Sequence, residues 1–271
     1  MLPGPRCRSI SPDAPISSLT FPVMITNNQR VMEPYTDIAT VYDYLLRHVD
    51  YQEWYEHIVS IMNYYVRKPE LVLELGCGTG RFGAKFSNDG YTIFGIDRSI
   101  DMLRVARTRA FLNFRILCAD ITRFHLAKKF DFIFSVHDTV NYLLEPADIL
   151  NMFRCVRDIM HEESVFMFDI TTEHNIFENF DGKISRYPLR NGSVQWGNVY
   201  DPETRLVRST LRFNRDGRTS EEEHLQRIYS IDEMRDLVGK GGFEILDICG
   251  DYTVDSPREN TIMVNFITRK A

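Results

Sequence analysis

Short apolar runs alternate with helical patterns between residues 71 and 170, and this alternation constrains the fold more than any other feature of the chain. The runs are continuously apolar, which is typical of strands that are covered on both faces. Helical patterns begin between them near Gly80, Ser99 and Pro146. We therefore predict an α/β fold with a mostly parallel sheet and crossover helices on both faces. The predicted strands are LVLEL, YTIFGI, FRILC, FDFIFSV and VFMFDI.

The residues before this region are predicted to form a flexible arm and a helical lead-in. The arm, residues 1–34, contains several prolines among serines and asparagines, a composition that disfavours helix and sheet. An organelle transit peptide is the alternative interpretation of the arm. Within residues 35–68, apolar side chains recur every three or four positions. This spacing indicates two amphipathic helices, separated near Val49 and Asp50.

A different pattern follows residue 171. Polar and apolar residues alternate over about residues 184–229, with turn residues in between, which predicts a small antiparallel insertion. The insertion either extends over the edge of the parallel sheet or forms a substrate lid, in which arginines such as Arg208 and Arg212 meet an anionic group. The acidic run Glu221–Glu223 is expected to be solvated.

The last part of the chain completes the predicted sheet. A helix is expected over IDEMRDLVGKGGF, and two closing strands over FEILDIC and TIMVNFITRK. These two strands bring the predicted sheet to seven, in one domain that spans residues 35–271.

Composition excludes several classes of protein. The chain of 271 residues has 32 Lys and Arg against 38 Asp and Glu, a net charge of −6, which disfavours binding to duplex nucleic acid. It has no apolar run of about 18 residues, so no membrane span is expected. The 5 cysteines form no C-x-x-C pair, which disfavours a structural metal or a disulfide framework and favours a cytoplasmic location.

A glycine-rich turn carries the chemical information. The strand LVLEL contains Glu74 and runs into Gly76–Gly80, and a helix follows at once. Such a turn lets a ligand lie against main-chain N–H groups at a helix N-terminus. The next strand ends at Asp97, where a carboxylate can accept hydrogen bonds from both hydroxyls of a ribose, and Asp120 follows the third strand.

The glycine spacing has other interpretations. An isolated G-x-G also occurs in ordinary tight turns between a strand and a helix. A nicotinamide-dependent oxidoreductase is a second interpretation, but Arg81 stands where a dinucleotide-binding motif requires its third glycine.

Taken together, the motifs resemble those of class I S-adenosylmethionine-dependent methyltransferases. The resemblance rests on ELGCGTG, GIDRSIDML, CADI and FDFIFSVHDTVNYL. Two further segments, YTDIATVYDYLLRHVDYQEW and HLQRIYSIDEMRDLVGKGGF, are similar to the small-molecule branch, which includes glycine N-methyltransferases and amino-sugar N,N-dimethyltransferases. The resemblance covers residues 35–271 and implies a Rossmann-like fold with S-adenosylmethionine as cofactor.

The resemblance also implies roles for individual residues. Gly76, Cys77 and Gly78 would lie against the methionine part of the cofactor, with Glu74 beneath the turn, where it would orient the turn or reach the cofactor amino group through water. Asp97 would bind the ribose.

The adenine end of the cofactor would be bound by residues after the second and third strands. Arg98 and Met102 would lie beside the ring, and Asp120 would accept a hydrogen bond from its exocyclic amine next to Ile121. Arg98 departs from the apolar residue common at this position, and stacking of its guanidinium on the adenine is the expected alternative.

The acceptor side is the least determined. Val136 and His137 would line the sulfonium and the mouth of the site, and His137 is a candidate proton acceptor or steering group. Tyr35 and Tyr42 are seven residues apart in the lead-in and are expected either to pack or to reach the cofactor or substrate; Tyr35 is a candidate cofactor-binding residue, and Tyr42 is the second catalytic candidate. Asn141 either borders the substrate or caps a helix.

The expected reaction is methyl transfer to a small molecule by in-line displacement, with positioning as the main source of catalysis. An amine acceptor is favoured over an oxygen acceptor, because a neutral amine can attack first and lose its proton afterwards. A catalytically silent cofactor-binding protein is a further alternative. Metal-dependent O-methylation would need several carboxylates after the fourth strand, where only Asp138 occurs. A monomer or homodimer is expected, with no bound metal.

Overall fold

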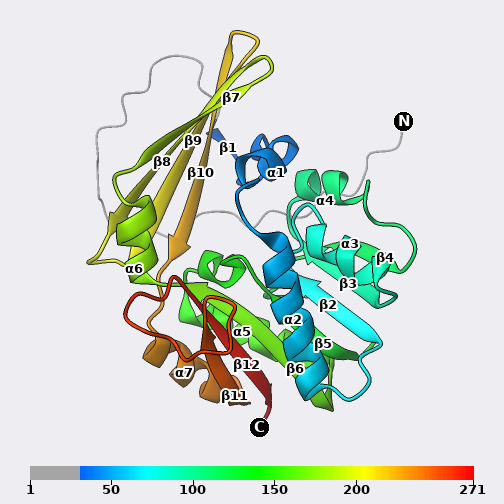
Figure 1. The fold of residues 1–271 in the computed structure, drawn as a ribbon. Coiled ribbons are helices and arrows are strands. Elements are labelled where there is room, and N and C mark those ends of the chain that lie inside the picture. Colours follow the sequence, from blue (N-terminus) through cyan, green and yellow to red (C-terminus); the bar gives the residue numbers. More distant parts are fainter. Residues whose placement is uncertain (1–30) are drawn as a thin grey trace.

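The computed structural model describes residues 31–271, so most of the predicted arm lies outside the described residues. A seven-stranded sheet forms the centre of the molecule (Figure 1), in the order β11-β12-β6-β5-β2-β3-β4. The strands β4, β3, β2, β5 and β6 are parallel, whereas β12 runs antiparallel to both of its neighbours. The predicted mostly parallel sheet is therefore confirmed. Its strands are β2 Leu71–Leu75, β3 Thr92–Asp97, β4 Phe114–Cys118, β5 Phe130–Ser135, β6 Met160–Thr171, β11 Phe243–Gly250 and β12 Met263–Lys270.

Helices cover both faces of this sheet. On one face, α2 (Tyr51–Tyr65) and α3 (Arg81–Asn88) pack on Val72, Phe132 and Phe134. On the other face, α5 (Pro146–Asp158) and α7 (Ile231–Lys240) pack on a second core of apolar side chains. The short helix α4 (Ile100–Ala106) follows β3, and Ser99 accepts a hydrogen bond from the Met102 N–H at its start. Two separate cores thus fix the sheet between helical layers.

A second sheet lies beyond the carboxyl ends of the parallel strands, at the top of Figure 1. It consists of β7 (Ile184–Leu189), β8 (Gly192–Asp201), β9 (Leu206–Arg215) and β10 (Arg218–Arg227), all antiparallel. The two-residue strand β1 (Val31–Met32) joins β10 in parallel. This sheet is the predicted insertion, and β7 and the turns α6 (Glu173–Asn175) and η3 (Ile176–Phe180) before it were not predicted.

Arg208 and Arg212 lie on the exposed face of the second sheet. Arg208 pairs with Glu223, and Arg212 pairs with Glu221 at 2.7 Å. Both arginine side chains are more than half exposed, at 52% and 61%. Because β9 alternates, these side chains lie opposite to the face that packs on the rest of the protein. The expectation of a lid whose Arg208 and Arg212 meet an anionic group is therefore wrong.

The first helix of the predicted lead-in is largely absent. In its place are two short turns, η1 (Ile38–Thr40) and α1 (Tyr42–Leu45). Tyr35 has a φ of 62°, and the N–H groups of Asp37 and Ile38 donate to the Glu222 carboxylate instead of to helical carbonyls. The second helix forms as α2, with Asp50 accepting hydrogen bonds from the Gln52 and Glu53 N–H groups.

Within residues 31–271, the helices are all too short or too polar to traverse a bilayer.

Candidate active site

The glycine turn after β2 has a conformation that requires glycine. Gly76, Gly78 and Gly80 have φ values of 74°, 52° and 76°, in the left-handed region. The N–H groups of Gly76 and Cys77 both donate to the Ile96 carbonyl, at 2.8 and 2.9 Å. A Cβ on Gly76 would also lie 2.4 Å from the Thr139 side chain. The turn is therefore folded tightly against the end of β3.

Asp97 joins this turn to the start of α4. Its Oδ2 accepts a hydrogen bond from the Gly78 N–H at 2.8 Å, and its Oδ1 accepts one from the Ser99 N–H at 2.8 Å. Burial raises the pKa of Asp97, and these hydrogen bonds partly offset that rise. The glycine turn and the carboxylate at the end of β3 thus form one structural unit, as the sequence predicts.

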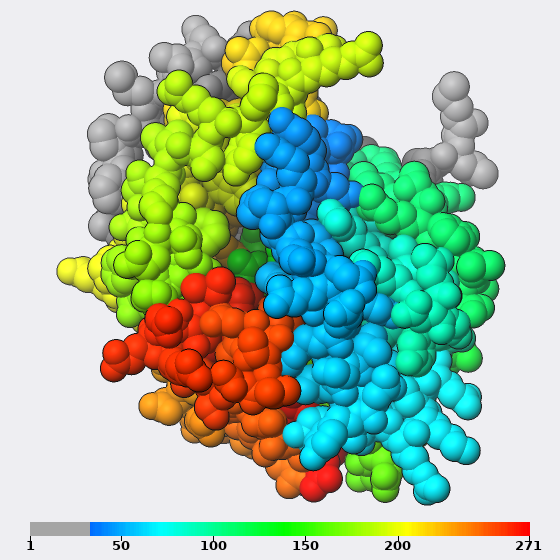
Figure 2. Space-filling model, in the orientation of Figure 1, coloured from blue at the N-terminus to red at the C-terminus, as the bar shows by residue number. Residues whose placement is uncertain are grey.

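A pocket opens beside this unit, and we call it the loop pocket. It is distinct from the hollow that Figure 2 shows between the yellow-green second sheet and the blue residues of the lead-in, because no residue of the second sheet lines the loop pocket. The loop pocket brings together predicted residues from four strand ends and from the lead-in. The predicted residues that line it are Tyr35, Tyr42, Gly76, Gly78, Asp97, Arg98, Met102, Asp120, Ile121 and His137, and Ala119, Thr139, Tyr142 and Leu143 complete its lining.

The remaining predicted residues, Glu74, Cys77 and Val136, line an adjoining side pocket beneath the turn. Glu74 is 3% exposed and lies on the sheet face that packs on α3. Its Oε2 is buried with no hydrogen-bond partner among residues 31–271. Burial and the nearby Asp97 raise the pKa of Glu74. An unpartnered buried carboxyl oxygen fits a cationic amino group of a ligand in this pocket.

At the opposite end of the loop pocket, Asp120 is held in a local turn. Its Oδ1 accepts hydrogen bonds from the Thr122 N–H at 2.9 Å and from the Thr122 hydroxyl at 2.7 Å. Burial alone would raise the pKa of Asp120, but these bonds and the charges of Arg123 and Arg98 lower it overall. An ionised acceptor therefore lies at this end of the pocket.

A strained turn after β5 contributes the residues between the two ends. His137 and Asp138 have φ values of 63° and 52°, which is uncommon outside glycine. Asp169 of β6 holds the turn, because its carboxylate accepts the His137 N–H at 2.7 Å and the Asp138 N–H at 2.9 Å. The Tyr252 hydroxyl donates to the same carboxylate. The strained turn is thus held by two hydrogen bonds to one buried carboxylate, which Tyr252 also binds.

Comparison with known proteins identifies the class of this chain. Residues 72–163 match the model of a family described as a methyltransferase domain. The chain is similar, at 26% identity and a TM-score of 0.77, to an S-adenosylmethionine-dependent methyltransferase from Clostridium acetobutylicum, with 88% of this chain and 99% of that one covered. The chain belongs to the S-adenosylmethionine-dependent methyltransferases.

Two further similarities extend over nearly the whole methyltransferase. YqeM of Bacillus subtilis (strain 168), provisionally named a methyltransferase, is 25% identical over 88% of this chain and 97% of its own length. CalS10, an amino pentose methyltransferase from Micromonospora echinaspora solved with S-adenosylmethionine bound, has a TM-score of 0.64 at 18% identity and covers 85% of this chain and 97% of its own. The second similarity shows a shared fold.

His137 of the methyltransferase lies in an aromatic setting. Its Nδ1 is 3.0 Å from the Tyr42 hydroxyl, and its ring centroid is 5.8 Å from that of Tyr51 and 5.2 Å from that of Trp54. Burial lowers the pKa of His137 to about 4, with smaller contributions from His48 and Arg81. A neutral, weakly basic imidazole is better suited to orienting Tyr42 than to removing a proton.

A His137→Ala variant should therefore reduce turnover by about fivefold to tenfold, the effect of one lost hydrogen bond. Affinity for S-adenosylhomocysteine should change less than turnover, and the pH dependence above pH 6 should keep its shape. Steady-state kinetics from pH 6 to 9 and calorimetric titration would measure these effects. Equal losses in turnover and affinity would show that His137 serves only to maintain the structure.

Sequence reasoning missed another pocket in the methyltransferase, which we call the sheet pocket. It lies between the second sheet and the lead-in, and shares Tyr35, Tyr42 and Tyr142 with the loop pocket. Its lining also includes Trp196, whose indole N–H donates to Asn198 at 3.0 Å. Alternation in β8 and β9 indicated one buried face, but not which segment it would meet. The other lining residues are Ile38, Leu46, Asp138, Ile176, Phe180, Asn198, Val207, Ser209, Leu211, His224 and Gln226.

Asn141 belongs to neither pocket lining. Its amide donates to the Arg227 carbonyl at 2.7 Å and accepts the Thr171 N–H at 3.0 Å. It is fully buried and connects η2 (Thr139–Tyr142) to β6 and β10. Neither of its predicted roles, bordering the substrate or capping a helix, matches these contacts.

Proposed function

We propose that this methyltransferase transfers a methyl group to an amine nitrogen of a small molecule held in the sheet pocket. The observation that carries the proposal is the charge of that pocket. Among the described residues that line it, Asp138 is the single acidic one, and none is Lys or Arg. A pocket with one carboxyl group and several aromatic rings favours a cationic or neutral amine over an anionic acceptor.

The loop and side pockets supply the cofactor site in this proposal. S-adenosylmethionine brings a methyl group already activated on a cationic sulfur. Asp97 would accept from the ribose hydroxyls, and Asp120 from the adenine amine. Glu74 would face the amino group of the methionine part. Its unpartnered oxygen supports this assignment, since no other described residue satisfies it.

Asp138 supports nitrogen as the acceptor. Burial raises the pKa of Asp138 to about 7, and the charge of Asp169 adds to the rise. A carboxylate of that pKa can take one proton from an ammonium group and leave a lone pair on nitrogen. The lone pair then forms the N–C bond while the C–S bond breaks. An alcohol would need a much stronger base, which the described lining lacks.

The name of CalS10 agrees with an acceptor of this type, because an amino pentose presents an amine on a small polar ring. The sheet pocket offers Asn198, Ser209 and Gln226 to the hydroxyls of such a ring and Trp196 to its apolar face. We infer an amine on a small, uncharged scaffold as the class of acceptor.

The test has two stages. Calorimetric titration should show binding of S-adenosylhomocysteine and no binding of nicotinamide dinucleotides. Label from methyl-labelled S-adenosylmethionine should then pass to amines but not to matched alcohols, for example to aminosugars but not to the parent sugars. Label on oxygen would contradict the amine proposal. Stabilisation by a dinucleotide alone would favour the oxidoreductase interpretation.

A further inference from the structure

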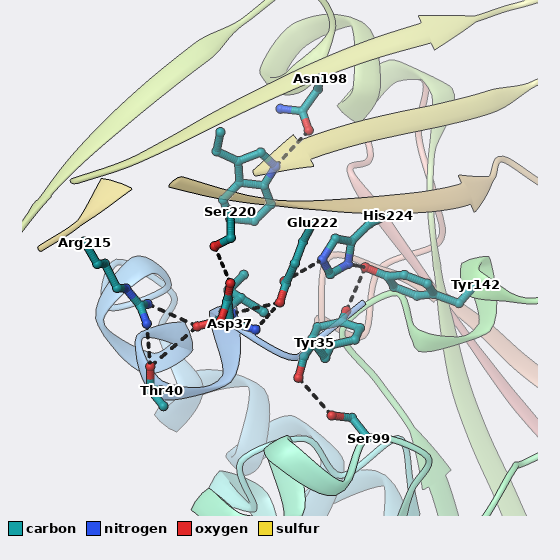
Figure 3. Close-up of polar contacts among 12 residues, drawn as sticks. Tyr35, Asp37, Thr40, Ser99, Tyr142, Asn198, Arg215, Ser220, Glu222 and His224 are labelled. Carbon is teal, nitrogen blue, oxygen red and sulfur yellow. Dashed lines mark hydrogen bonds and ion pairs between the residues drawn. The ribbon is translucent and has the colours of Figure 1, made fainter. Parts of the chain in front are cut away.

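Residues 33–41, which we call the strap, cross between the two sheets and bring Tyr35 to the wall shared by the loop and sheet pockets. Figure 3 shows the strap between α4 and the second sheet. The Tyr35 carbonyl accepts a hydrogen bond from the Ser99 hydroxyl at 2.9 Å, and Ser99 also donates its N–H to Asp97. One side of the strap is thus tied to the predicted ribose site.

The other side of the strap is tied to Glu222 of β10. Glu222 is 0% exposed, and its Oε1 accepts the N–H groups of Asp37 and Ile38. The Ser220 hydroxyl donates to the Asp37 carboxylate, and Arg215 donates to the Asp37 carbonyl at 3.1 Å. The expectation that Glu221–Glu223 is a solvated run is therefore wrong for its middle residue.

Glu222 also begins a chain of side-chain hydrogen bonds that returns to Tyr35. Its Oε2 lies 3.4 Å from Nε2 of His224, and Nδ1 of His224 lies 3.1 Å from the Tyr142 hydroxyl. The Tyr142 hydroxyl accepts a hydrogen bond from the Tyr35 hydroxyl at 2.7 Å. Figure 3 shows these groups in sequence along one side of the strap.

The direction of each hydrogen bond follows from Glu222. The Glu222 carboxylate accepts the two N–H groups of the strap through Oε1, and its Oε2 likewise accepts the ring proton that His224 carries on Nε2. With the ring proton on Nε2, Nδ1 of His224 is an acceptor, and the Tyr142 hydroxyl donates to it. The Tyr142 oxygen in turn accepts the Tyr35 proton. The single hydroxyl proton of Tyr35 is therefore used in the hydrogen bond to Tyr142. The lone pairs of the Tyr35 oxygen can then accept a hydrogen bond between the two pockets.

We propose that Glu222 is a positioning residue that, through His224 and Tyr142, makes the Tyr35 oxygen a hydrogen-bond acceptor for the amine of the methyl acceptor. This inference rests on the proposed function, because it assumes the cofactor in the loop pocket and the acceptor in the sheet pocket. This arrangement adds a source of specificity. The Tyr35 oxygen can accept a hydrogen bond from an N–H group of the methyl acceptor, whereas it would repel an acceptor atom such as a carbonyl oxygen.

A Glu222→Gln variant should reverse the direction of the hydrogen bonds between residue 222, His224 and Tyr142, with almost no change in the shape of the side chain. The amide oxygen remains the acceptor for Asp37 and Ile38, so the amide nitrogen faces His224 and donates to its Nε2. His224 must then carry its proton on Nδ1 and donate to Tyr142. The Tyr142 hydroxyl then accepts from His224 and no longer donates to it. The Tyr35 hydroxyl therefore no longer has to donate to Tyr142.

The ratio of two binding constants reports this reversal without any acceptor. Sinefungin is an analogue of S-adenosylmethionine with an amine-bearing carbon in place of the methylated sulfur, whereas S-adenosylhomocysteine has no donor there. We expect the wild type to prefer sinefungin, and Glu222→Gln and Tyr35→Phe each to reduce that preference by about tenfold. Calorimetry at pH 7.5 on the full chain would measure both ligands.

Two controls separate positioning from a purely structural role. Glu223→Gln changes the neighbouring residue on the exposed face of β10 and should leave the ratio unchanged. Adding Glu222→Gln to Tyr35→Phe should reduce the ratio no further, because Glu222 acts through the Tyr35 hydroxyl oxygen and the Phe variant already lacks that oxygen.

Each outcome of this experiment decides the inference. Loss of preference in both single variants, with no further loss in the double variant, supports it. An unchanged ratio in Glu222→Gln, or equal weakening of both ligands, overturns it while leaving the proposed function intact. If the wild type binds neither ligand, the proposed function fails and this inference fails with it.

Discussion

An Asp97→Ala variant should bind S-adenosylhomocysteine more than tenfold more weakly than the wild type. The carboxylate of Asp97 is expected to accept two hydrogen bonds from the ribose, and charge-assisted bonds contribute about 1.5–3 kcal/mol each. It also holds the Gly78 and Ser99 N–H groups at 2.8 Å, so its loss loosens the glycine turn. Calorimetric titration would measure the change.

Adenine alone separates these two contributions, because it lacks the ribose. If Asp97 acts on the ribose, the affinity for adenine should change much less than that for S-adenosylhomocysteine. Equal weakening of both ligands would mean that Asp97 acts through the turn, and unchanged affinity would remove the ribose assignment. Asp101→Ala is the matched control, since Asp101 lies in α4 nearby and pairs with the exposed Arg104.

The geometry of the proposed cofactor side was predictable because its determinants are local in sequence. A strand that ends in Gly76–Gly80, and a second strand that ends in Asp97, bring backbone N–H groups and a carboxylate to one edge of a parallel sheet whatever the rest of the chain does. Glycine tolerates the left-handed φ values that the turn requires. The position of each of these residues at the end of its strand therefore determines where it lies in the folded protein.

The proposed acceptor side depends on contacts between residues far apart in the chain. Glu222 contacts Asp37, which is 185 residues earlier, and from sequence Glu222 looked like the middle of a solvated acidic run. The helical spacing of Tyr35 and Tyr42 was overridden by the same contacts, because backbone N–H groups of the strap bind Glu222 instead of forming a helix. Neither periodicity nor motif spacing contains this pairing.

The left-handed turn at His137 and Asp138 was also beyond sequence reasoning. Nothing in the segment FSVHDTVNY predicts the positive φ values of His137 and Asp138. The conformation exists because Asp169, 31 residues or more away, accepts both N–H groups. As a result Asp138 lines the sheet pocket, and His137 turns toward Tyr42. The sequence suggested His137 as the proton acceptor, whereas our proposal gives that role to Asp138, which lines the sheet pocket.

An Asp138→Asn variant should be more stable than the wild type at pH 8 and yet about a hundredfold slower. The pKa of Asp138 is raised from 3.8 to about 7 by burial and by Asp169. The folded protein therefore retains a proton that the unfolded chain releases near pH 4, and stability falls as the pH rises from about 4 to 7. Asparagine has no charge to bury, so this loss disappears, with a gain of about 1–2 kcal/mol at pH 8.

The same substitution removes the group that would take the proton from the acceptor ammonium, and a general base contributes about 10²-fold or more to a rate. Wild-type kcat/KM should rise with pH through about 7, and the variant should lose that rise. Urea unfolding at pH 4, 6 and 8 would measure the stability. Asp158→Asn, at the exposed end of α5, is the control and should change neither property. If Asp138 were only structural, the Asp138→Asn variant would lose stability and activity together. A gain in stability with a loss of activity would indicate that the buried carboxyl group is kept for the reaction at a cost in stability.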